Sequence, residues 1–145
     1  MKITCQSEVG SLHTIFIKHA KDALINDTNI DKEWQILNFT ARPNLQLALE
    51  EYARFESFIK ETGAKINYLP QNDTVTMDSM YCRDASIATD AGMILCTMGK
   101  VQRIPEPLAE KAAFLENNIP ILGRSGSRCA RGRRAAAVTR ANMVR

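Results

Sequence analysis

The chain of 145 residues has no apolar run that approaches the roughly 18 residues needed to span a bilayer. No apolar segment typical of a secretory signal occurs in its first residues, MKITCQSEVGSLH. Its four cysteines, Cys5, Cys82, Cys96 and Cys129, form no CxxC pair. We therefore expect a cytoplasmic protein with reduced thiols, no metal, no cofactor and no membrane partner.

Acidic residues are absent from residues 123–145, and this absence divides the chain into two chemically different segments. Residues 1–122 contain 12 Lys and Arg against 16 Asp and Glu, a net charge of −4. Residues 123–145 contain seven Arg, a net charge of +7. The composition as a whole, 45% hydrophobic and 24% charged, is ordinary for a soluble globular domain.

The hydrophobic patterns predict an α/β fold made of short strands and two longer helices. Apolar or alternating runs predict strands over 12–18, 65–69, 80–89 and 92–98, and another that begins at 119. Apolar residues at i, i+3, i+4 and i+7 spacing predict helices over 44–62 and 105–118. Because strands alternate with helices, the order β-α-β-β-β-α-β favours the α/β class.

Turn-forming residues mark the ends of several of these elements. Gly63 is a suitable stop for the first helix, and Asp90-Ala91-Gly92 predicts a tight hairpin. Residues 26–29, Asn-Asp-Thr-Asn, predict a loop. The second helix is expected to bury an apolar face made of Leu108, Ala112 and Leu115.

The segment from Met77 to Ala85, MDSMYCRDA, concentrates the chemistry of the chain. If residues 80–84 are extended, Cys82 and Asp84 share one face, while Tyr81 and Arg83 share the other. A carboxylate on such a strand could hold a planar guanidinium by a charge-assisted, bidentate pair. On spacing alone, two acids and an arginine near a loop are more often a solvated turn with a local ion pair.

A short basic segment follows the predicted hairpin. Lys100 and Arg103 could hold the carboxylate of a ligand, or they could pair with Glu106. The sequence leaves both possibilities open.

The order of these segments from Arg42 to Pro107 resembles the guanidino-group-modifying, or pentein, superfamily. That superfamily includes dimethylarginine dimethylaminohydrolases, arginine deiminases and glycine amidinotransferases. The resemblance is carried, in order, by the segments LHTIFIKH, RPNLQLALEEYARFESFIKETG, DSMYCRD and MGKVQRIPE. It implies a five-bladed α/β propeller of ββαβ units, of which this chain would form roughly the first two.

The resemblance also implies substrate-binding roles for Asp78, Arg83, Asp84 and Arg103. Asp84 matches the acid that grips the substrate guanidinium, and Asp78 matches an acid that lines the same pocket. Arg103 matches a position that binds the carboxylate end of the substrate or braces that site. Arg83 matches an arginine of the deiminase and amidinotransferase branches that is acidic in some dimethylargininases, so the branch stays open.

The family reaction is covalent: a cysteine thiolate attacks the guanidinium carbon while a histidine, assisted by an acid, shuttles protons. None of these three residues can be matched here, since His13 and His19 lie too early and Cys82 lies inside the binding block. Cys82 and Cys96 are better interpreted as small buried apolar residues. We therefore expect a fragment that has no catalytic residues and is inactive alone, and whose full-length relative acts on an arginine derivative.

The match ends at Gly123, and three explanations of residues 123–145 are open. The segment is an out-of-frame translation after a gene break, a basic tail that binds polyanions, or a disordered tail. One back-translation of Arg131-Gly132-Arg133, CGA-GGG-CGG-C, spells Glu-Gly-Gly when shifted by one base, which is the start of the family's acidic motif.

The rival function is a non-enzymatic α/β module with a basic tail. Nucleic acid is a less favoured partner because no aromatic residues interleave the arginines. The sequence leaves the oligomeric state open.

Overall fold

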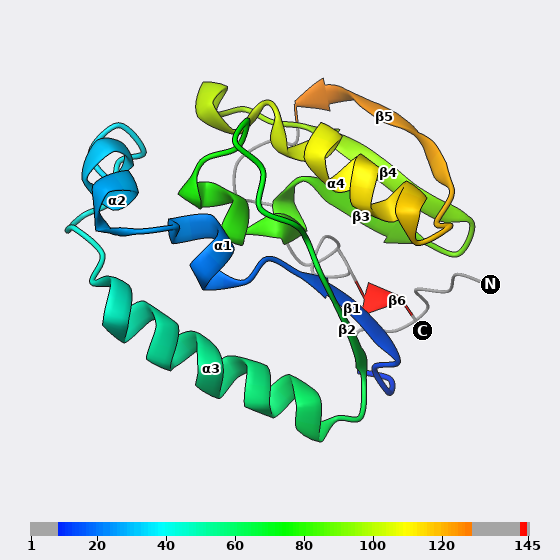
Figure 1. Ribbon diagram of the computed structural model, residues 1–145. Coiled ribbons are helices and arrows are strands. Elements are labelled where there is room, and N and C mark those ends of the chain that lie inside the picture. The colour runs from blue at the N-terminus through cyan, green and yellow to red at the C-terminus, as the bar shows by residue number, and fades with distance from the viewer. Residues whose placement is uncertain (1–8, 129–142, 145) are drawn as a thin grey trace.

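The computed structural model describes residues 9–128 and 143–144 of the chain (Figure 1). The strands are β1 (Thr14–Ile17), β2 (Lys65–Tyr68), β3 (Ser86–Thr89), β4 (Gly92–Thr97), β5 (Ile121–Arg128) and β6 (Met143–Val144). The α-helices are α1 (Ala20–Leu24), α2 (Asp27–Glu33), α3 (Leu45–Glu61) and α4 (Glu106–Glu116). Three short 3₁₀ helices complete the fold: η1 (Met77–Met80), η2 (Cys82–Asp84) and η3 (Val101–Arg103).

The strands form two three-stranded sheets, ordered β2-β1-β6 and β3-β4-β5. In the first sheet, β1 and β2 are parallel and are connected through α1, α2 and α3. In the second sheet, β3 and β4 form an antiparallel hairpin, and β5 returns parallel to β4 after α4. Each sheet thus contains a strand–helix–strand unit, and the predicted α/β class is confirmed.

Strand β1 is buried on both faces, because its alternate side chains enter two different apolar cores. Ile15 and Ile17 pack with residues of α1, α2 and α3. Phe16 points to the opposite core, where its ring meets Phe114 of α4 edge to face at 5.2 Å. In Figure 1, α3 accordingly lies on one side of β1 and β2, and α4 lies over β3 and β4. The core that contains Phe16 and Phe114 also contains residues of β3 and β4, and it therefore joins the two sheets.

The limits of α3 follow from its capping residues. The Asn44 side chain accepts a hydrogen bond of 2.9 Å from the Leu47 amide, which satisfies one of the free donors of the first turn. At the other end, Gly63 has a φ of +74°, a conformation that glycine adopts without steric cost. The predicted helix over 44–62 and its stop at Gly63 are confirmed.

The loop predicted at residues 26–29 is wrong, because this segment begins α2. Asn26 adopts an extended conformation, and its side chain accepts a hydrogen bond of 2.8 Å from the Asn29 amide. The same short polar side chains favour loops and helix N-termini, so composition alone did not distinguish the two.

The apolar face predicted for α4 is also wrong. Leu108, Ala112 and Leu115 are exposed. The buried face contains Ala113 and Phe114 together with Glu106 and Glu110. Two acids inside the fold require partners there, and these partners define the candidate site.

The Arg-rich segment is described only in part. Strand β5 continues to Arg128, and β6 pairs with β1 in antiparallel fashion, neither of which the sequence pattern predicted. Residues 129–142, which include most of the arginines, lie outside the described residues, as does Cys5. The assignment of 123–145 to a separate aberrant or basic tail therefore stays a prediction. Within the described part of the chain, no helix is long and apolar enough to cross a membrane.

Candidate functional site

Residues 77–84 contain two 3₁₀ helices, Met77–Met80 and Cys82–Asp84, so the extended conformation predicted for residues 80–84 is wrong. The Tyr81 amide donates to the Asp78 carbonyl at 2.9 Å, and the Asp84 amide donates to the Tyr81 carbonyl at 3.2 Å. These i→i+3 bonds coil the chain until Ser86, where β3 begins. The predicted alternation of faces is lost, and Arg83 lies beside Asp84, with Nε 3.6 Å from Oδ1.

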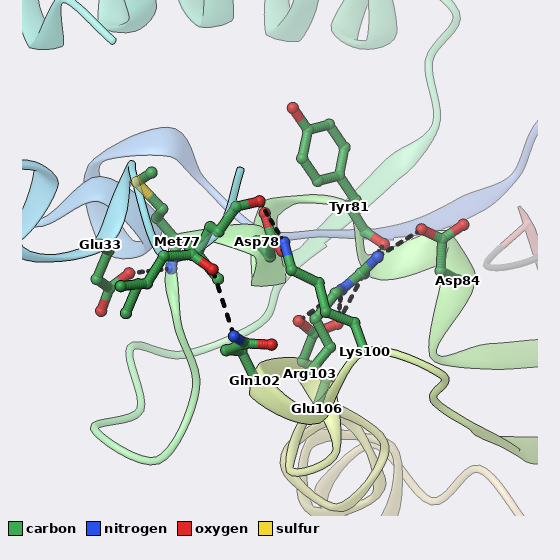
Figure 2. A network of polar contacts seen from close by, with 11 residues as sticks. Glu33, Met77, Asp78, Tyr81, Asp84, Lys100, Gln102, Arg103 and Glu106 are labelled. Carbon is green, nitrogen blue, oxygen red and sulfur yellow. Dashed lines mark hydrogen bonds and ion pairs between the residues drawn. The ribbon is translucent and has the colours of Figure 1, made fainter. Parts of the chain in front are cut away.

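Arg103, at the end of η3, is the centre of the polar network in Figure 2. Its Nε donates to both carboxylate oxygens of Glu106, at 2.8 and 3.0 Å. Its Nη1 donates to Asp84 Oδ2 at 2.8 Å, and its Nη2 donates to Glu106 Oε2 at 2.8 Å and to the Tyr81 carbonyl at 3.1 Å. The guanidinium therefore ties η2, η3 and α4 together.

The three charged groups of this network differ in their access to solvent. The side chains of Arg103 and Glu106 are 11% and 2% exposed, whereas that of Asp84 is 42% exposed. The side chain of Arg83 is more exposed still, at 67%. Because every nitrogen of Arg103 is engaged inside the protein, this geometry favours a bracing role for Arg103 over direct binding of a ligand carboxylate. Asp84 presents the accessible charge.

Burial and pairing set the protonation of the inner groups. Burial alone would lower the pKa of Arg103, but its hydrogen bonds to Glu106 and Asp84 outweigh burial, and the pKa of the guanidinium is raised. Burial raises the pKa of Glu106, which Arg103 offsets only in part, and the nearby charges of Asp78 and Asp84 add to the rise. Glu106 and Asp84 share the guanidinium of Arg103 as their common partner.

Asp78 belongs to a second branch of the network. Its side chain is buried, and Oδ2 accepts a hydrogen bond of 2.6 Å from Lys100 Nζ. Lys100 Nζ also donates to the Leu37 carbonyl at 2.5 Å. The amide of the neighbouring Met77 donates to Glu33 Oε2 at 2.7 Å, so the end of α2 is attached to η1. Of the two cations that the sequence allowed to pair with Glu106, Arg103 does so, whereas Lys100 pairs with Asp78, a partner that the sequence did not predict.

Glu110, one turn after Glu106 on α4, is the residue that sequence reasoning missed. Its Oε2 accepts a hydrogen bond of 2.6 Å from the Ser86 hydroxyl. The pKa of Glu110 is raised to about 8, chiefly by burial. The charges of Glu106 and Asp84 also raise this pKa, whereas the hydrogen bond from Ser86 and the charge of Arg103 lower it. The i, i+4 spacing of the two glutamates was the available signal, but it is equally typical of a solvated helix face.

An open cleft borders Glu106. Its walls contain Lys18, Pro70, Ser79, Glu106 and Glu110, and its volume of about 320 Å³ includes the solvent at its mouth. The Lys18 ammonium donates to the Pro70 carbonyl and is thereby fixed to one wall. Glu106 is therefore shared between this cleft and the Arg103 network.

Cys82, Cys96 and His19 lie within the packed part of the fold or contact it. Cys82 and Cys96 are buried, as predicted, and the Cys82 thiol donates to the Phe16 carbonyl at 3.8 Å. The His19 ring stacks on Tyr52 with the centroids 4.7 Å apart, and its Nδ1 accepts a hydrogen bond from the Lys21 amide. Within residues 9–128 and 143–144, no group of three or more histidine, cysteine or acidic side chains could hold a metal ion.

Comparison with known proteins gives a similarity of fold. No protein-family profile and no curated protein matches the chain. Its fold is similar to a solved structure of dimethylarginine dimethylaminohydrolase, an adduct with 4-chloro-2-hydroxymethylpyridine, with a TM-score of 0.56 and 17% identity. The similarity covers 80% of this chain and 41% of that chain. At this identity, the likeness concerns the fold alone.

The buried carboxyl of Glu110 predicts a stability that falls as pH rises. Between the ordinary pKa of 4.5 and the folded pKa of about 8, the folded protein keeps a proton that the unfolded chain releases. This difference lowers the free energy of unfolding by at most about 1.4 kcal/mol per pH unit. Urea unfolding of Glu110→Gln across this range should show a shallower fall, with a residual slope from Glu106.

The matched control is Glu116→Gln, which removes an exposed acid from the same helix. It should keep the slope of the unmodified chain. An equal slope for Glu110→Gln and the unmodified chain would contradict the assignment of this titration to Glu110.

Proposed function

We propose that this chain supplies the guanidinium-recognition part of a guanidino-group-modifying enzyme that acts on an arginine derivative. The observation that carries the proposal is the geometry of Asp84, a half-exposed carboxylate whose Oδ2 is fixed by a buried arginine. A carboxylate that is both oriented and accessible is suited to accept the paired N–H groups of a planar cation. The similarity of the fold to a dimethylarginine dimethylaminohydrolase supports the same substrate class.

Each residue of the site has a distinct proposed role. Asp84 accepts the N–H groups of the ligand guanidinium, and Arg103 holds Asp84 in place. Asp78 contributes the second negative charge from the buried side of the site. Arg83, which is exposed and only 3.6 Å from Asp84 Oδ1, moves aside or contacts a negatively charged part of the ligand.

The complete enzyme would be an α/β propeller that uses a covalent cysteine intermediate. In this proposal it hydrolyses a C–N bond of a methylated arginine or transfers the amidino group to an amine. The chain spans 41% of the length of the dimethylarginine dimethylaminohydrolase structure, and no catalytic cysteine, histidine or acid can be matched within its sequence. The chain by itself would therefore bind a guanidinium without converting it.

Neutralising Asp84 should weaken the binding of small guanidinium ions. We expect Asp84→Asn to raise the Kd for methylguanidinium about tenfold or more, because charge-assisted hydrogen bonds are lost while the side-chain shape is kept. Isothermal titration calorimetry with methylguanidinium chloride and L-arginine measures the effect. Neutral N-methylurea, which has nearly the same shape, should not bind.

Asp73→Asn is the matched control, since Asp73 is an exposed acid in the connection before η1. It should leave the Kd unchanged. Equal affinity of methylguanidinium for the Asp84→Asn and Asp73→Asn variants would rule out the proposed site.

No turnover is expected from the chain alone. Incubation with L-arginine or asymmetric dimethylarginine should give no citrulline above the buffer level, as followed by mass spectrometry with an active hydrolase as the positive control. Citrulline formation that disappears in the Asp84→Asn variant would show that a nucleophile is present and would overturn the proposed inactivity.

A further inference from the structure

Lys100 occupies a position that determines how Asp78 meets a ligand. Asp78 is only 5% exposed, and a carboxylate buried to this extent needs a cation. Lys100 supplies that cation at 2.6 Å and comes from the segment that follows β4. The charge of Asp78 is thus compensated by a side chain of the protein itself (Figure 2).

The same ammonium holds a distant segment of the chain. Residues 34–39 follow α2 and pass close to η3, where Lys100 Nζ donates to the Leu37 carbonyl at 2.5 Å. The Gln102 side chain donates to the adjacent Ile36 carbonyl at 3.3 Å. Leu37 itself is buried in the core beside α3, whereas Ile36 is exposed. Lys100 therefore connects the buried acid to the backbone of residues 34–39.

From this connection we infer that Lys100 is a positioning residue that competes with the ligand for Asp78 and couples ligand binding to residues 34–39. This inference rests on the proposed function. A guanidinium that approaches both acids needs the face of Asp78 that the ammonium holds. When the Lys100 ammonium leaves the Asp78 carboxylate, its hydrogen bond to the Leu37 carbonyl is also released or redirected. The segment then loses one of its two side-chain attachments to the region of η3.

The competition has a predictable effect on affinity. If Asp78 is paired with Lys100 for nine-tenths of the time, the apparent Kd for the ligand is about tenfold higher than it would be if Lys100 did not occupy Asp78. Removing the ammonium should therefore tighten ligand binding. A purely structural ion pair predicts the opposite, because its loss would leave Asp78 poorly placed and would weaken binding.

The chain contains a spectroscopic probe at the required place. Trp34 is its only tryptophan, lies at the start of residues 34–39 and is partly buried against the core beside α3. Its fluorescence therefore reports the position of this segment without any label. Methylguanidinium has no absorption that interferes with tryptophan emission.

The test titrates methylguanidinium into the full chain and into Lys100→Met, Lys100→Arg and Lys111→Met. In the unmodified chain, Trp34 emission should shift to the red with saturation. Lys100→Met should bind about tenfold more tightly and show the red-shifted emission before ligand is added. Lys100→Arg retains a competing cation and should bind no more tightly than the unmodified chain. Lys111→Met removes an exposed charge from α4 and should behave as the unmodified chain.

The outcomes separate this inference from the proposed function. Binding that is equal in the unmodified chain and Lys100→Met, without a change in Trp34 emission, would overturn the coupling and leave the Asp84 site intact. Absence of binding to every variant would overturn the proposed function and the inference with it. If Lys100→Met fails to fold by circular dichroism, the emission shift of the unmodified chain and the affinity of Lys100→Gln decide the question.

Discussion

The ion-paired cluster of Arg103, Glu106 and Asp84 is the interaction on which the rest of the site depends. Arg103 compensates a glutamate that is nearly inaccessible to solvent through its Nε and Nη2 atoms, while its Nη1 donates to Asp84. Loss of one partner of such a pair typically costs about 3–5 kcal/mol, because the other charge is left buried and unpaired. The cluster therefore fixes the relative positions of η2, η3 and α4, and it leaves Asp84 as the charge that a ligand can reach.

Lys100 and Arg103 both come from the short segment that follows β4, and they pair with different acids. Lys100 turns toward Asp78 and residues 34–39, while Arg103 turns toward Asp84 and α4. The segment is held by the β3–β4 hairpin on one side and by α4 on the other. The segment therefore links Asp78 and residues 34–39 on one side to Asp84 and α4 on the other.

The sequence predicted the elements whose signals are local. The apolar stripe of α3, the hairpin at Asp90-Ala91-Gly92 and Gly63 were sufficient for their elements. The strand predicted over residues 80–89 begins only at Ser86, because residues 81–85 close i→i+3 hydrogen bonds that no local signal in the sequence indicated. The buried face of α4 was not predictable either, since Glu106 and Glu110 are stabilised by partners distant in the fold. The residues of the proposed site were predicted from a resemblance, and their pairing with one another required the structure.

The central claim, that Asp84 braced by Arg103 receives a guanidinium, is tested most directly by nuclear magnetic resonance of the ¹⁵N-labelled chain. The Nε–H signal of Arg103 should shift with saturation as methylguanidinium is added, together with the backbone amide of Asp84. The Nε–H signal of Arg54, an exposed arginine on α3, should stay in place. An Arg103 signal that does not move, or one that moves no more than that of Arg54, would contradict the claim.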